Sequence, residues 1–263
     1  MLLAQITDPH VTAAGALLFG RLDTAAHLAR AVAHLNRLRP DFVLVTGDLV
    51  NDGTPAEYRN LRGILAALDA PHALLPGNHD ERANLRAAFV DHAYWPTEGE
   101  FLHYTIEDLP LRLIALDTQV PGEPGGRLCA ARLAWLAARL AEQPRRPTVI
   151  AMHHPPFVSG LAHLDAMNCA GGEALGAIVA RHPQVERIVC GHVHRPIFLR
   201  WHGTIVSTAP STAHQVALDL SPDAPSSWLA EPPACHLHYW RPEVGLVTHL
   251  SLIGDYGPRR PFG

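Results

Sequence analysis

Short apolar runs alternate with amphipathic segments over roughly the first two hundred residues. Between Asp23 and Leu38, apolar side chains recur at steps of three and four residues, which is typical of a helix with one buried face. Thr54-Pro55 predicts the start of a second helix, because threonine caps helices and proline suits the first helical position. Further helices are expected at 82–89, 129–141 and 172–182, and strands at 2–6, 42–46, 72–75, 101–106, 111–117, 148–152, 185–190, 197–201 and 204–207.

This alternation predicts an α/β fold in which functional loops follow the carboxyl ends of parallel strands. The apparent hairpins indicate a mixed sheet, or two sheets packed together. From Asp219 the alternation of strands and helices stops. A proline-rich loop follows, and then a last hairpin is expected over 234–240 and 246–252. We therefore predict one main domain over 1–218 and a C-terminal hairpin cap or arm over 219–263, packed on the core or on a partner subunit. The apolar residues of this hairpin favour a homo-oligomer, a dimer or larger, and packing on its own core is the alternative.

The 263 residues suffice for one full hydrophobic core, and 48% of them are apolar. A formal charge of −4 argues against a nucleic-acid binder, which would normally present a basic face. The opening Met1–Ile6 is too short for a signal peptide, and no apolar run reaches the length of a membrane span, so a cytoplasmic protein is expected. The four cysteines are scattered without paired spacing, which favours reduced and mostly buried thiols.

Five clusters of metal-ligand residue types follow predicted strands at the point where each strand ends. They offer two carboxylates, one amide and four imidazoles: Asp8, His10, Asp48, Asn78, His153, His192 and His194. Seven such ligands are too many for one ion and about right for two divalent or trivalent ions that share a carboxylate, with Fe, Mn, Zn or Co suited to this mixture. Each cluster alone could be a turn or a surface histidine, but their joint occurrence favours a metal centre. The residues alone do not decide between His153 and His154.

Five segments carry a resemblance to a known family: Asp8-Pro9-His10, Gly47-Asp48-Leu49-Val50-Asn51, Gly77-Asn78-His79-Asp80, His153-His154-Pro155-Pro156 and Gly191-His192-Val193-His194. They resemble the conserved blocks of the calcineurin-like metallophosphoesterases over roughly residues 1–215, and most of all the bacterial glycerophosphodiesterases and class III cyclic nucleotide phosphodiesterases. The resemblance implies a sandwich of two mixed β-sheets flanked by helices. It also implies that Asp48 bridges two ions, with Asp8, His10 and His194 on one ion and Asn78, His153 and His192 on the other.

The function implied is a metal-dependent phosphodiesterase for small diesters, glycerophosphodiesters or 3′,5′-cyclic nucleotides, with attack by a metal-bound hydroxide. Asp48 and His79 are the candidate catalytic residues, and Asn78, His79 and His214 are the candidate contacts to substrate. One departure weakens the case for His79 as an acid, because Asn51 stands where many family members carry an aspartate that orients this histidine.

Two alternative functions remain open. A phosphomonoesterase would use the same centre but needs more positive charge for a dianion, and near the site only Arg21, Arg82 and Arg195 could supply it. The other alternative is a metal-binding regulatory protein without catalytic activity, but the complete set of ligands argues against it. No stable nucleic-acid or membrane partner is expected.

Overall fold

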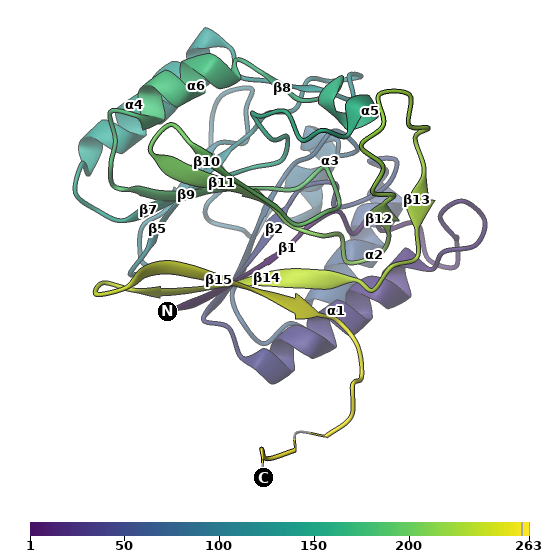
Figure 1. Ribbon diagram of the computed structural model, residues 1–263. Helices are drawn as coiled ribbons and strands as arrows, with labels where there is room; N and C mark the ends of the chain where they lie inside the picture. The colour runs from purple at the N-terminus through teal and green to yellow at the C-terminus, as the bar shows by residue number, and fades with distance from the viewer. Residues whose placement is uncertain (259, 263) are drawn as a thin grey trace.

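Two mixed β-sheets pack face to face in the computed structural model, which describes residues 1–258 and 260–262 (Figure 1). Sheet 1 has the strand order β15-β14-β1-β2-β3, and Sheet 2 has the order β10-β11-β9-β7-β5-β4. The strands of Sheet 1 are β1 (Leu2–Ile6), β2 (Phe42–Thr46), β3 (His72–Leu75), β14 (Ala234–Arg241) and β15 (Gly245–Leu252). Those of Sheet 2 are β4 (Tyr104–Ile106), β5 (Arg112–Leu116), β7 (Thr148–Met152), β9 (Val185–Cys190), β10 (Ile197–Trp201) and β11 (Thr204–Thr208).

The sandwich is flanked by helices, as the resemblance implied. On one side lie α1 (Thr24–Leu38), α2 (Pro55–Leu65) and α3 (Arg82–Ala88), and on the other α4 (Ala130–Glu142) and α6 (Gly172–Val179) (Figure 1). Helix α2 begins as predicted: the Thr54 side chain accepts from the Glu57 amide, and the Glu57 carboxylate accepts from the Thr54 amide. This reciprocal capping box satisfies two amides that a helix start otherwise leaves unpaired.

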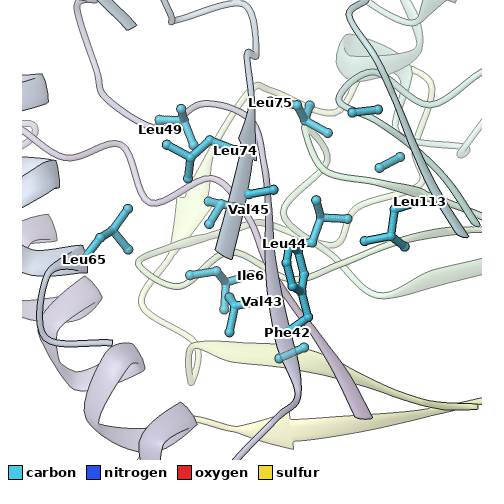
Figure 2. Close-up of a cluster of buried hydrophobic side chains, with 14 of the residues drawn as sticks. Ile6, Phe42, Val43, Leu44, Val45, Leu49, Leu65, Leu74, Leu75 and Leu113 are labelled. Atoms are coloured by element: carbon cyan, nitrogen blue, oxygen red, sulfur yellow. The ribbon is translucent and has the colours of Figure 1, made fainter. Parts of the chain in front are cut away.

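The hydrophobic core lies between the two sheets and continues under the helices. Alternate residues of β2 face opposite sides, so Phe42 and Leu44 point toward Leu113 of Sheet 2 while Val43 and Val45 face the helices (Figure 2). Both faces of the central strands are buried, which explains their unbroken apolar sequence. A second cluster joins the outer face of Sheet 2 to α4 and α6.

The parallel strands β1, β2 and β3, and likewise β5, β7 and β9, run alongside one another within their sheets. Their carboxyl ends therefore lie at one end of the sandwich. The strands at 42–46, 72–75, 148–152 and 185–190 have the predicted bounds. The strand expected from residue 101 forms only from Tyr104, and the helix expected to residue 182 ends at Val179.

Several short elements escaped prediction. They are β6 (Gly126–Arg127), α5 (Ala162–Asp165), β8 (Cys169–Ala170), β12 (Gln215–Val216) and β13 (Trp228–Leu229). These segments of two to four residues are too short to show a periodic pattern.

The C-terminal hairpin is an integral part of Sheet 1, because β14 pairs antiparallel with β1 over Leu2–Gln5. The division at residue 218 and the homo-oligomer stay predictions. Across the described residues, no helix combines the length and the apolar character that crossing a membrane requires.

Candidate metal centre

The five clusters of candidate ligands meet at one end of the sandwich. Three follow β1, β2 and β3 of Sheet 1, and two follow β7 and β9 of Sheet 2. Residues separated by as many as 186 positions thereby come within hydrogen-bonding range, as the contact between Asp8 and His194 shows. Groups of acidic and imidazole side chains close enough to hold an ion include Asp8, His10 and His194 in one set and Asp8, Asp48 and His153 in another.

One half of the centre is formed by Asp8, His10 and His194, which are all buried. The His194 Nε2 lies 3.3 Å from Asp8 Oδ1 and 3.2 Å from His10 Nε2. The other ring nitrogen of His194, Nδ1, lies 3.0 Å from the carbonyl oxygen of His214. A proton on Nδ1 can be donated to that carbonyl, which leaves the Nε2 lone pair directed at the centre.

The other half is formed by Asn78, His153 and His192. The Asn78 Oδ1 lies 3.2 Å from His153 Nε2 and 3.1 Å from His192 Nδ1. His153 is oriented in the same manner as His194, because its Nδ1 lies 2.8 Å from the carbonyl oxygen of Thr46. Both halves therefore present imidazole lone pairs whose direction is fixed by a backbone carbonyl.

Asp48 lies between the two halves. Its Oδ2 is 3.6 Å from His10 Nε2 and 3.3 Å from His153 Nε2. Its Oδ1 accepts a hydrogen bond of 2.9 Å from the His79 amide, which holds the carboxylate in place. This position is the one that a carboxylate shared by two ions requires.

The backbone is strained at the ligand positions. Of the eight non-glycine residues with positive φ in the described part of the chain, five are candidate ligands: Asp8, His10, Asp48, His192 and His194. Each such conformation costs about 1–3 kcal/mol and persists only where the surroundings enforce it. Glycine is required next to them, since a Cβ at Gly77 would overlap the backbone nitrogen and Oδ1 of Asp48.

The charges at the centre suit a cation. Burial opposes ionisation of Asp8, yet nearby His194 and His153 lower its pKa to about 2. Burial likewise opposes protonation of His153, yet Asp48 and Asp8 raise its pKa to about 9. Two buried carboxylates thus draw positive charge toward themselves, and a divalent ion held by these oxygen and nitrogen donors would provide it. The residues present therefore fit a metal centre.

The contacts of His153 and His154 differ, although both lie with His192 in a further group of imidazoles close enough to hold an ion. The Nδ1 of His154 lies 2.8 Å from Thr118 Oγ1, and its Nε2 lies 3.2 Å from the carbonyl oxygen of Pro124. Both ring nitrogens of His154 are thus engaged away from the carboxylates. His153 instead presents Nε2 to Asp48, which supports its assignment as the ligand.

His79 lies at the exposed side of the centre, with its ring 4.7 Å from that of His10. Its Nδ1 is 2.7 Å from the backbone carbonyl oxygen of Asn51, whereas the Asn51 side chain donates to Asp52. The orienting group is therefore the main chain of residue 51 and not its side chain. Burial lowers the pKa of His79, but Asp48 and the Asn51 carbonyl raise it above the ordinary value.

His214 also reaches the centre, with its ring 4.6 Å from that of His194 and 5.5 Å from that of His10. Burial and the neighbouring His194 lower the pKa of His214 to about 3, so this imidazole is neutral at physiological pH. All of the site residues expected from the sequence are thus brought together, and their roles stay predictions.

Sequence reasoning missed the residues that support the ligand loops. Asp80 accepts from the amides of Leu49 and Gly77, at 3.1 and 2.8 Å, and from the Tyr58 hydroxyl at 2.9 Å, which ties two of the loops together. Ser211 donates to the Asp8 carbonyl at 2.8 Å. Only Asp80 could have been noticed, because it ends the segment Gly77–Asp80; serine in a loop carries no comparable signal.

Known proteins are similar to this chain in sequence, and others are similar in fold. The chain is 39% identical over 265 residues to the probable glycerophosphodiester phosphodiesterase GpdQ of Arcobacter nitrofigilis, covering 100% of this chain and 97% of that protein. It is 32% identical over 218 residues to the 3′,5′-cyclic adenosine monophosphate phosphodiesterase CpdA of Escherichia coli K12, covering 81% of this chain and 76% of that protein.

Among solved structures, a dimetal phosphatase from Danio rerio superposes with a TM-score of 0.65 at 16% identity, covering 97% of this chain and 99% of the other, which shows a shared fold. The model of the calcineurin-like phosphoesterase family matches residues 1–196. That match covers all five ligand-bearing segments, and the chain belongs to the calcineurin-like phosphoesterases.

Proposed function

We propose that this protein is a phosphodiesterase with a binuclear metal centre that hydrolyses small phosphodiesters, either glycerophosphodiesters or 3′,5′-cyclic nucleotides. The observation that carries the proposal is the position of Asp48, whose Oδ2 lies within 3.6 Å of His10 Nε2 on one side and within 3.3 Å of His153 Nε2 on the other. Calcineurin-like phosphoesterases use a binuclear metal centre, and a shared carboxylate is what such a centre needs.

The residues that would hold the ions are divided between the two halves. Asp8, His10 and His194 would hold one ion, Asn78, His153 and His192 the other, and Asp48 both. The mixture of carboxylate, amide and imidazole donors suits Fe, Mn, Zn or Co. When bound, such ions lower the pKa of a water molecule and neutralise charge on the phosphoryl oxygens.

We infer that His79 protonates the leaving group. Because Nδ1 is engaged by the Asn51 carbonyl, Nε2 is the nitrogen free to face the alkoxide that departs from phosphorus. This main-chain contact supports the acid role of His79, although Asn51 stands where many family members carry an aspartate. Neutral His214 and the Asn78 amide would hold substrate oxygens by hydrogen bonds.

Charge around the centre favours a diester over a monoester. Arg82 is committed to Asp117, with Nε 2.6 Å from Oδ2, and Arg195 to Glu231, with Nη1 2.9 Å from Oε2. Two of the three arginines considered as partners for a dianion are therefore already paired. The names of the relatives, a glycerophosphodiester phosphodiesterase and a cyclic AMP phosphodiesterase, point the same way.

The proposal is tested by comparing bis(p-nitrophenyl) phosphate with p-nitrophenyl phosphate after Mn, Zn or Co has been restored to the purified protein. A diesterase hydrolyses the diester faster, and chelation abolishes the activity. Preference for the monoester would identify a phosphomonoesterase. A protein that binds two metal ions per chain but hydrolyses neither ester would be the regulatory alternative.

A further inference from the structure

An aromatic residue stands at the tip of a tight turn beside the metal centre. Leu18 and Leu22 exchange two backbone hydrogen bonds of 2.9 Å, and the Arg21 amide donates to the Leu18 carbonyl at 3.1 Å. The two central residues of this turn, Phe19 and Gly20, both have positive φ, at 53° and 67°. Two consecutive positive φ values are the pattern of a type I′ turn, which favours asparagine, aspartate or glycine at its first central position.

Phenylalanine is costly at this position. A bulky side chain with positive φ is rare, because its Cβ approaches the backbone too closely. Phe19 is moreover 54% exposed, so it gains only part of the stabilisation that burial of a phenyl ring provides. The turn itself would be more favourable with a small polar residue, and the reason for a phenyl ring must lie in what it faces.

Phe19 faces two aromatic rings near the metal centre. It stacks on Trp228 with ring centroids 5.4 Å apart and planes inclined by 24°. Both rings meet His214 edge-on, each at 5.7 Å. Figure 1 shows why they meet: the loop after β1 lies beside β13, the short strand that carries Trp228. We call Phe19 and Trp228 the aromatic wall.

The wall is separated from the candidate ligands by one imidazole. His214 lies against both rings of the wall, and on its other side its ring is 4.6 Å from that of His194. Phe19 therefore lies one side chain away from a candidate ligand and is partly exposed to solvent. A nucleotide likewise carries its base one sugar away from its phosphate.

We propose that the aromatic wall binds the planar base of a nucleotide phosphodiester by stacking, which makes Phe19 and Trp228 the residues that select nucleotide over glycerol diesters. The inference rests on the proposed function, since it places the phosphoryl group at the metal centre. Stacking of a base on an aromatic side chain contributes about 1–3 kcal/mol. A quaternary ammonium group would also suit an aromatic surface, and the second test below includes a choline diester to separate it from a base.

The first test measures binding and needs no turnover. Isothermal titration calorimetry of the metal-restored protein compares AMP with ribose 5-phosphate, which has the same phosphate and sugar but lacks the base. AMP is expected to bind about 10-fold more tightly. Phe19→Asn and Trp228→Leu should each remove most of this difference, and Trp228→Phe should keep it.

Phe198→Asn is the matched control, because Phe198 is 53% exposed but lies on β10, outside the aromatic wall. It should leave the preference for AMP intact. Equal affinity of the unaltered protein for AMP and ribose 5-phosphate would overturn the proposal. An equal loss of AMP preference in Phe198→Asn would also overturn it.

The second test measures hydrolysis of two diesters. Phe19→Asn should raise KM for cyclic AMP about 10-fold and change KM for glycerophosphoethanolamine less than about 2-fold. Its melting temperature should be equal to or higher than that of the unaltered protein, because asparagine suits the turn. A parallel loss on both diesters, or a rise in KM for glycerophosphocholine without one for cyclic AMP, contradicts base stacking.

The two tests separate this inference from the proposed function. If the protein prefers AMP through the aromatic wall but hydrolyses no diester, the proposed function is wrong and the base-binding surface stands. If it hydrolyses diesters but Phe19→Asn affects cyclic AMP and glycerophosphoethanolamine alike, the function stands and the inference is wrong.

Discussion

Buried histidines form two contrasting groups in this protein. The metal-centre histidines are His10, His153, His192 and His194, at the carboxyl ends of the parallel strands. The hairpin histidines are His236 and His238 on β14, which face the interior between the sheets. Both groups are almost fully removed from water, so burial alone does not distinguish them.

Their charged neighbours differ in sign. Burial opposes protonation of both His153 and His192, whereas Asp48 and Asp8 favour it: the pKa of His153 rises to about 9, and that of His192 falls to about 3. Burial also opposes protonation of His236, and the nearby Arg187 adds to this, so that its pKa falls to about 4. Carboxylates make the first group a place for cations, whereas the arginine makes the second group a place that excludes them. Neighbouring charge, and not the number of histidines, therefore identifies the site.

The largest expected effect comes from removing the carboxylate charge of Asp48, which distinguishes the metal-centre histidines from the hairpin histidines. Asp48→Asn keeps the shape of the side chain but removes its charge, and we expect activity to fall by more than about 10⁴-fold, to background. Bound metal should fall below two ions per chain, as measured by elemental analysis after reconstitution. His236→Phe is the control and should retain both metal and activity. Two ions per chain in Asp48→Asn would refute the bridging role.

His79 is an exposed imidazole beside the metal centre, and its proposed role as an acid can be tested separately from metal binding. His79→Ala should lower kcat by about 10²–10⁴-fold on a diester with an alkoxide leaving group, and by less on a p-nitrophenyl ester that needs no proton. Asn51→Ala should stay near full activity, since the contact to His79 comes from the main chain. Full activity of His79→Ala on the alkoxide ester would contradict the assignment.

The hairpin histidines should make the free energy of unfolding depend on pH. The pKa of His236 is about 4 in the folded protein and about 6.5 when unfolded, so the folded state binds this proton less readily. The folded state keeps its full stability above pH 6.5, where the imidazole is neutral in both states. As the pH falls from 6.5 toward 4, the unfolded state binds the proton first, and the free energy of unfolding decreases by about 2–3 kcal/mol. His236→Phe should reduce that loss, as measured by denaturant unfolding at pH 7.5 and pH 4.5. An unchanged difference between the two pH values would show that His236 does not titrate in this range.

A smaller effect is expected from the arginine that faces this histidine. Arg187→Met removes a positive charge but keeps much of the apolar stem, so the pKa of His236 should rise toward its ordinary value. The loss of stability between pH 7.5 and pH 4.5 should shrink by up to about 1 kcal/mol. Metal content should not change, because Arg187 lies on β9 away from the carboxylates. A steeper loss on acidification would mean that Arg187 stabilises the charged ring.

The sequence determined the elements and the residue types of the site. The apolar run Phe42–Thr46 and the cap at Thr54 were readable because strands and helix starts depend on side chains close together in the chain. The same holds for the placement of Asp48 and His153 after strands, since the carboxyl ends of parallel strands must share one end of a sheet.

The tertiary structure alone decided which groups do the orienting. The proposed choice of His153 over His154 rests on the contacts of His154 to Thr118 and to the Pro124 carbonyl. The orientation of His79 comes from its contact to the Asn51 carbonyl. Every residue has such a carbonyl, so its position cannot be recognised from the side-chain sequence. The meeting of Phe19 with Trp228, 209 positions apart, was equally hidden, because a contact between distant residues exists only once the chain has folded.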